Sequence, residues 1–116
     1  MISHVLVVDD DQAFRGLAAR VLTALGIGEV VEAGTVAAAL EAAERLEPVA
    51  ALVDVGLPDG DGVDLAARLV AAPWGPRVVL TSSDPAAAAR AGSIPFIAKD
   101  DLADGDLQSL LAGGEE

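Results

Sequence analysis

The chain has 116 residues, the size of a single domain with one hydrophobic core. Hydrophobic residues make up 53% of it and cysteine is absent, which argues against disorder and excludes disulfide bonds and thiol chemistry. With 7 basic against 19 acidic residues the net charge is -12, which disfavours direct binding of nucleic acid and favours cations or basic partners. We expect a cytoplasmic location, because the sequence shows neither a signal peptide nor a membrane-length apolar run.

In chain order, short apolar runs alternate with longer stretches of helical periodicity. The apolar runs predict five strands, at residues 4–8, 29–33, 49–54, 77–82 and 95–98. The periodic stretches predict helices over residues 12–25, 36–46, 62–71, 85–91 and 104–111. We find no linker or repeat, so residues 1–116 are expected to form one domain.

Polar residues that suit helix N-caps precede four of these helices: Asp11, Thr35, Asp61 and Asp84. Pro85 then fits the first position of the helix that follows Asp84, and Gly92 fits the position past its end. Asp59 lies in a Gly-rich segment and is interpreted as a turn residue.

Strands buried on both faces and separated by helices indicate an α/β fold with a doubly wound parallel sheet. Ligands of such folds bind at the carboxyl ends of the strands. Polar residues stand at these strand ends in the sequence: Asp9, Asp10, Asp54, Thr81 and Lys99.

Three neighbouring carboxylates need a counter-charge, and oxygen ligands select a hard divalent cation such as Mg2+. Thr81 and Lys99 offer a hydrogen-bond donor and a positive charge, which suit a phosphoryl group. One carboxylate could then act as a nucleophile and take the phosphoryl group as an aspartyl phosphate.

Four segments carry a resemblance to a known family: VLVVDD (5–10), LVDVGLPDGDG (52–62), VVLTSS (78–83) and FIAK (96–99). In order and spacing they resemble the response regulator receiver domains of two-component signalling, and the resemblance covers nearly the whole chain. It implies a flavodoxin-like sheet of strand order 2-1-3-4-5 flanked by five helices.

The resemblance also implies roles for single residues. Asp54 is the expected phosphoacceptor. The domain is expected to catalyse its own phosphorylation and dephosphorylation there, with Thr81 and Lys99 as the other catalytic residues. No separate enzyme activity is expected. Asp9, Asp10, Asp54 and the backbone carbonyl of Gly56 are the expected Mg2+ ligands. Thr81 and Phe96 are the expected switch residues. The family usually has proline after the lysine, but Asp100 stands there, and we expect a trans peptide.

The implied partners are a histidine kinase or histidine phosphotransfer protein as donor. A downstream protein or output domain would read the face formed by the fourth helix, fifth strand and fifth helix, and the resemblance allows a homodimer. Two alternatives stay open. A degenerate receiver would act as an interaction module without phosphorylation. A Mg2+-dependent phosphatase with an aspartate nucleophile is disfavoured, because Gly56 stands where a second aspartate is needed.

Overall fold

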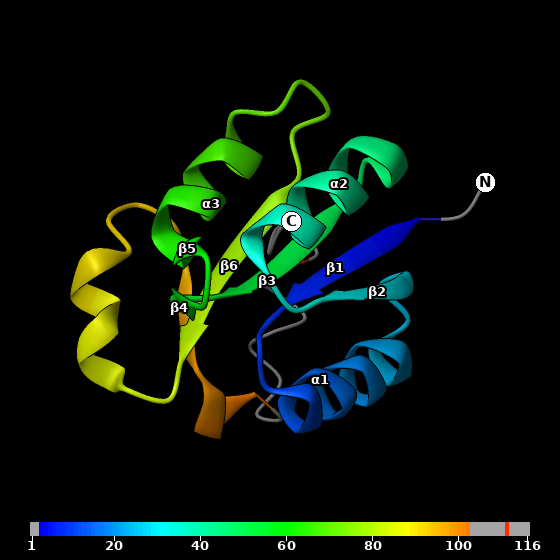
Figure 1. The fold of residues 1–116 in the computed structure, drawn as a ribbon. Coiled ribbons are helices and arrows are strands. Elements are labelled where there is room, and N and C mark those ends of the chain that lie inside the picture. Colours follow the sequence, from blue (N-terminus) through cyan, green and yellow to red (C-terminus); the bar gives the residue numbers. More distant parts are fainter. Residues whose placement is uncertain (1–2, 103–110, 112–116) are drawn as a thin grey trace.

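The computed structural model describes residues 3–102 and residue 111. A five-stranded parallel sheet forms the centre of the molecule (Figure 1), with the strand order β2-β1-β3-β6-β7. Its strands are β1 (His4–Val8), β2 (Glu29–Ala33), β3 (Ala50–Asp54), β6 (Arg77–Ser82) and β7 (Phe96–Ala98). Counting only these five strands along the chain, the order is 2-1-3-4-5, so the predicted fold class and strand order are confirmed.

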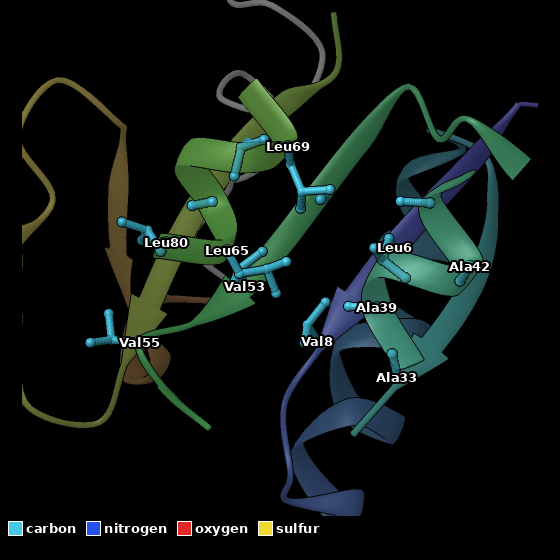
Figure 2. Packing of buried hydrophobic residues seen from close by; sticks show 14 of the residues in the cluster. Leu6, Val8, Ala33, Ala39, Ala42, Val53, Val55, Leu65, Leu69 and Leu80 are labelled. Atoms are coloured by element: carbon cyan, nitrogen blue, oxygen red, sulfur yellow. The ribbon is translucent and has the colours of Figure 1, made fainter. Parts of the chain in front are cut away.

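Helices cover both faces of the sheet, as Figure 1 shows: α1 (Gln12–Leu25) lies on one face, and α2 (Val36–Leu46) and α3 (Gly62–Val70) lie on the other. Alternate residues of each strand point to opposite faces. Leu6, Val53 and Leu80 therefore pack under α2 and α3 (Figure 2), whereas Val7 and Val79 pack with α1. Burial on both faces explains why the strands are almost uninterrupted runs of apolar residues.

The predicted N-caps Asp11, Thr35, Asp61 and Asp84 all accept hydrogen bonds from the first turn of the helix that they precede. Within residues 3–102 the predicted ends of the elements also agree with the structure to within one residue. The third strand begins at Ala50 instead of residue 49, the third helix ends at Val70, and the fifth strand begins at Phe96.

The predicted short fourth helix is present, but Pro85–Arg90 forms it as a 3-10 helix, η1, and not as an α-helix. None of its residues is fully buried and only Ala87 packs against the core cluster, so packing gives little support to a full α-helix here. A second short 3-10 helix, η2, spans Lys99–Asp101. The predicted helix at 104–111 lies outside the described residues except for Leu111, which is buried. No helix in the described part of the chain is long and apolar enough to cross a membrane.

A small hairpin of β4 (Gly56–Leu57) and β5 (Gly60–Asp61) was not predicted. Asp59 lies in its turn, as expected, but its carboxylate also reaches a distant helix. It accepts hydrogen bonds from the backbone N–H groups of Val36 and Ala37 at 2.7 and 3.1 Å. These two bonds lower the pKa of the Asp59 carboxyl group. The hairpin is thereby attached to the first turn of α2.

Candidate functional site

The carboxyl ends of four strands bring the predicted polar residues together at one edge of the sheet. Asp9 follows β1, Asp54 ends β3, Thr81 lies near the end of β6, and Lys99 follows β7. Asp54 and Thr81 are register partners on adjacent strands.

The alternation of strand residues also places these side chains on one face. Residues two positions apart point the same way. Asp9, Asp54, Thr81 and Lys99 follow Val7, Leu52, Val79 and Ile97 at this spacing, and all four of those residues pack in the cluster with α1. The site therefore lies on the α1 side of the sheet edge.

Three carboxylates form the centre of the site. Asp9, Asp10 and Asp54 each offer an oxygen, and these oxygens all lie within 4.8 Å of one another. Asp9 is 0% exposed and Asp54 7% exposed, whereas Asp10 is exposed. One oxygen of Asp9, Oδ1, accepts a hydrogen bond from the backbone N–H of Asp11 at 2.9 Å. An all-oxygen set of this density fits a hard divalent cation.

Lys99 is the positive group among these carboxylates. Its Nζ lies 2.6 Å from Oδ2 of Asp9 and 3.8 Å from Oδ2 of Asp54. The same ammonium lies 4.5 Å from the centroid of the Phe14 ring. No sequence pattern indicates this last contact, because Phe14 occupies an ordinary apolar position of an amphipathic helix.

The environment of Asp54 raises the pKa of its carboxyl group to about 6. Burial contributes most to the increase, followed by the nearby negative charge of Asp9. The Lys99 ammonium and the backbone N–H of Gly56 act in the opposite direction. A cation bound at this edge would favour the ionised form of Asp54, which is the form that can act as a nucleophile.

Thr81 presents a buried hydroxyl group beside this aspartate. Thr81 is 0% exposed, and its Oγ1 has no hydrogen-bond partner among the described residues. A buried hydroxyl without a partner is unfavourable. This hydroxyl is therefore available for an additional group bound at Asp54.

Backbone contacts hold the loop that follows Asp54. Val55 N–H donates to the carbonyl of Thr81 at 2.9 Å, and Gly62 N–H donates to the carbonyl of Val55 at 2.8 Å. A Cβ atom at position 62 would lie 1.8 Å from the Asp54 carbonyl oxygen, so only glycine fits there. Gly56, the expected source of a carbonyl ligand, is exposed where this loop enters the hairpin.

Two arginines near the site make contacts that were not predicted. Arg15 donates from Nη1 to the carbonyl oxygen of Asp9 at 2.6 Å and pairs with Glu32 at 3.2 Å. Arg90, at the end of η1, pairs with Asp61 of the hairpin. Sequence patterns miss such pairs because the partners are 17 and 29 residues apart.

Phe96 lies apart from the four side chains of the site. It is half-buried and packs against the core cluster under α2 and α3, on the opposite face of the sheet from Phe14. Within residues 3–102 no cis peptide bond occurs, so the Lys99–Asp100 bond is trans as expected.

Comparison with known proteins identifies one family, in agreement with the resemblance seen in the sequence. The family model described as "Response regulator receiver domain" matches residues 5–111. The KDP operon transcriptional regulatory protein KdpE of Escherichia coli is 34% identical over 114 residues, which are 95% of this chain and 50% of that protein. The chain thus spans about half the length of the curated relatives it matches first.

Solved structures of the same kind are similar in fold. A CheY-like response regulator receiver domain from Methylobacillus flagellatus has a TM-score of 0.77 and 25% identity, covering 95% of this chain and 99% of that one. A response regulator from Burkholderia pseudomallei, solved with a phosphorylated aspartic acid, calcium ion and citrate, has a TM-score of 0.78 and 25% identity. That match covers 94% of this chain and 66% of the other.

Proposed function

Because this chain belongs to the response regulator receiver family, we propose that it accepts a phosphoryl group on Asp54 from a histidine kinase or a histidine phosphotransfer protein. The observation that carries the proposal is the convergence of groups around Asp54. Two further carboxylates offer oxygens within 4.8 Å, and the Lys99 ammonium lies 3.8 Å away. Thr81, the register partner of Asp54, adds a buried hydroxyl without a partner among the described residues.

In the transfer, an ionised carboxylate oxygen of Asp54 attacks phosphorus. A P–O bond to Asp54 forms while the P–N bond to the donor histidine breaks, and the leaving imidazole takes up a proton. Lys99 and the Thr81 hydroxyl are suited to bind the phosphoryl oxygens as a charge and a hydrogen-bond donor. Release follows when water attacks the acyl phosphate, so the domain acts only on itself and not on a separate substrate.

Asp9, Asp10, Asp54 and the carbonyl of Gly56 are the residues proposed to hold Mg2+. These residues fit a hard divalent cation because they offer only oxygen atoms as ligands and because the negative charges of the three carboxylates lie close together. When bound, the cation would offset negative charge on the carboxylates and on the phosphoryl oxygens. Asp9 keeps its orientation through the Asp11 N–H, and its backbone carbonyl is held by Arg15.

Signal output is proposed to follow from Thr81 and Phe96. A phosphoryl group on Asp54 would draw the Thr81 hydroxyl toward it, and Phe96 would repack as β6 and η1 adjust. The face formed by η1, β7 and the segment after it would then be read by a downstream protein, an output domain or a second copy of the chain. All of η1 lacks buried residues, so it can move at little cost in packing. We propose that this reaction takes place in the cytoplasm.

The test is incubation with Mg2+ and a small acyl-phosphate donor, followed by intact mass spectrometry and peptide mapping. We expect one phosphoryl group, on Asp54, and none on Asp54→Asn, because an amide is not a competent nucleophile. Asp64→Asn is the matched control, since Asp64 is an exposed carboxylate in the first turn of α3. This control should be labelled like the unmodified protein.

A phosphoryl group on another residue would overturn the assignment of Asp54. Absence of labelling with acyl-phosphate donors, together with a partner that binds Asp54→Asn as tightly as the unmodified protein, would instead favour a degenerate receiver.

A further inference from the structure

Lys99 is the single lysine of the chain, and its ammonium group has three neighbours in the site. Two are the carboxylates of Asp9 and Asp54, at 2.6 and 3.8 Å. The third is the aromatic ring of Phe14, whose centroid lies 4.5 Å away. The carboxylates change their charge or partners when a cation or a phosphoryl group binds, whereas the ring does not.

We propose that Phe14 is a positioning residue, which keeps the Lys99 ammonium at Asp54 while the carboxylate partners of Lys99 change. The proposal rests on the function proposed above. An ammonium group is attracted to the face of an aromatic ring, and the attraction grows where water is excluded. A phenyl ring neither binds a divalent cation nor carries a charge, so this contact survives when Asp9 becomes a metal ligand.

The position of the Phe14 ring is fixed by its backbone and by its packing. Phe14 lies in the first turn of α1, where its backbone N–H donates to the Asp11 cap at 3.4 Å. Its side chain, 8% exposed, packs in the same core cluster as Ala18, Leu22 and Ile97. Both the helix that carries the ring and the strand that leads to Lys99 are therefore anchored in one cluster.

The contact between Lys99 and Asp9 is short, but it depends on a carboxylate oxygen that a cation would also use. Oδ2 of Asp9 lies 2.6 Å from the ammonium, so this contact is weakened when a cation binds Asp9. Lysine has a flexible stem and a non-directional charge. Once Asp9 is engaged by a cation, the ring is what keeps this stem from turning toward solvent.

This role separates two measurable quantities. Without the ring, the ammonium is lost from Asp54 and phosphoryl acceptance slows. Binding of Mg2+ does not weaken, because a positive group that repels the cation is also free to leave. General damage to the site would weaken both.

The experiment compares the unmodified protein with Phe14→Leu and with pentafluorophenylalanine at position 14. Fluorination keeps the shape of the ring but removes the negative potential of its face. For both variants we expect phosphorylation by a small acyl phosphate to slow about three- to tenfold, from the usual strength of such contacts. The Mg2+ dissociation constant, measured by calorimetry, should stay the same or decrease.

Nuclear magnetic resonance of the ¹⁵N-labelled lysine ammonium gives a readout independent of phosphorylation, and a single signal is expected from the single lysine. This signal should shift in both position 14 variants of the metal-free protein. Pentafluorophenylalanine at position 96 is the control and should leave the signal in place, because Phe96 packs on the other face of the sheet.

An unchanged ammonium signal, an unchanged phosphorylation rate, or a parallel loss of Mg2+ affinity in the position 14 variants would each overturn the role of Phe14. If the unmodified protein accepts no phosphoryl group at all, the proposed function fails. The ammonium signal of the metal-free protein then still decides whether the ring holds Lys99.

Discussion

The hydroxyl of Thr81 illustrates how a single residue can be arranged for a state other than the resting one. It is fully buried and has no hydrogen-bond partner among residues 3–102. Such a group destabilises the resting protein, because its hydrogen bonds to water are lost and not replaced. It becomes favourable only when an acceptor, such as a phosphoryl oxygen, is bound beside it.

We therefore expect Thr81→Val to stabilise the metal-free, unphosphorylated protein by about 1 kcal/mol, because valine fills a similar volume without a hydroxyl. Urea denaturation monitored by circular dichroism measures this change. The same variant should still accept the phosphoryl group. On phosphorylation, however, the amide resonance of Phe96 should shift less in this variant than in the unmodified protein. Ser82→Ala on the same strand is the control for loss of a hydroxyl that is not fully buried. Destabilisation of Thr81→Val by 1 kcal/mol or more would contradict this account.

The sequence was sufficient to locate those site residues that directly follow a predicted strand. Asp9, Asp54 and Lys99 follow apolar runs directly, and parallel topology then requires that they meet at one edge. Phe14 and Arg15 could not be recognised in the same way. Their contacts with Lys99 and with the Asp9 carbonyl depend on how α1 packs against the strand ends, which no local pattern encodes.

At the scale of elements, the hairpin after β3 connects the site to α2. Asp59 caps Val36 and Ala37 from 23 and 22 residues away, and Thr35, the residue just before the helix, caps Ala38. The helix start thus has one local cap and one cap supplied by the loop that follows the proposed phosphoacceptor. The loop and the helix start are expected to be ordered together.

Replacing Asp59 by alanine should lower the melting temperature by a few degrees, because two N–H groups at the start of α2 lose their acceptor. Hydrogen exchange at Val36 and Ala37 should become faster. Thr35→Ala is the matched variant: it should expose Ala38 N–H instead and leave the hairpin in place. Unchanged exchange at Val36 in Asp59→Ala would show that the hairpin does not support the helix.

The elements also show where sequence periodicity is sufficient and where it fails. The end residues of α1 and α2 were predicted correctly, because an apolar stripe and an N-cap agree at each. Residues 85–90 have high helix propensity from alanine, yet they form a 3-10 helix with no buried residue. Propensity alone cannot replace packing against the sheet. The hairpin was missed because its strands have two residues each, too few for any pattern.

For the molecule as a whole, the parallel sheet concentrates negative charge at the edge where its ligands would bind. The chain carries a net charge of -12, and three of its carboxylates meet within 4.8 Å at this edge. Folding must bring these carboxylates together against their repulsion. The stability of the metal-free protein is therefore expected to depend on pH and on divalent cations.

The direction of the pH dependence follows from Asp54. Its pKa rises from 3.8 to about 6 on folding, mainly through burial and then through the charge of Asp9. The folded protein thus holds this proton more tightly than the unfolded chain does. The resulting stabilisation is complete below pH 3.8 and is lost as the pH rises through about 6.

We expect the free energy of unfolding of the metal-free protein to lose up to about 3 kcal/mol from this group between pH 4 and pH 7. Urea denaturation across that range measures the loss. Asp54→Asn should remove most of the slope and be more stable than the unmodified protein at pH 7, because the amide cannot ionise. Asp64→Asn, at an exposed position on α3, should keep the slope. An equal pH slope in Asp54→Asn and the unmodified protein would show that the charge at this edge is not what limits the stability of the fold.

Millimolar Mg2+ at pH 7 should stabilise the unmodified protein, since a ligand of the folded state shifts the equilibrium toward it. It should stabilise Asp54→Asn less, because one of the three carboxylates is missing.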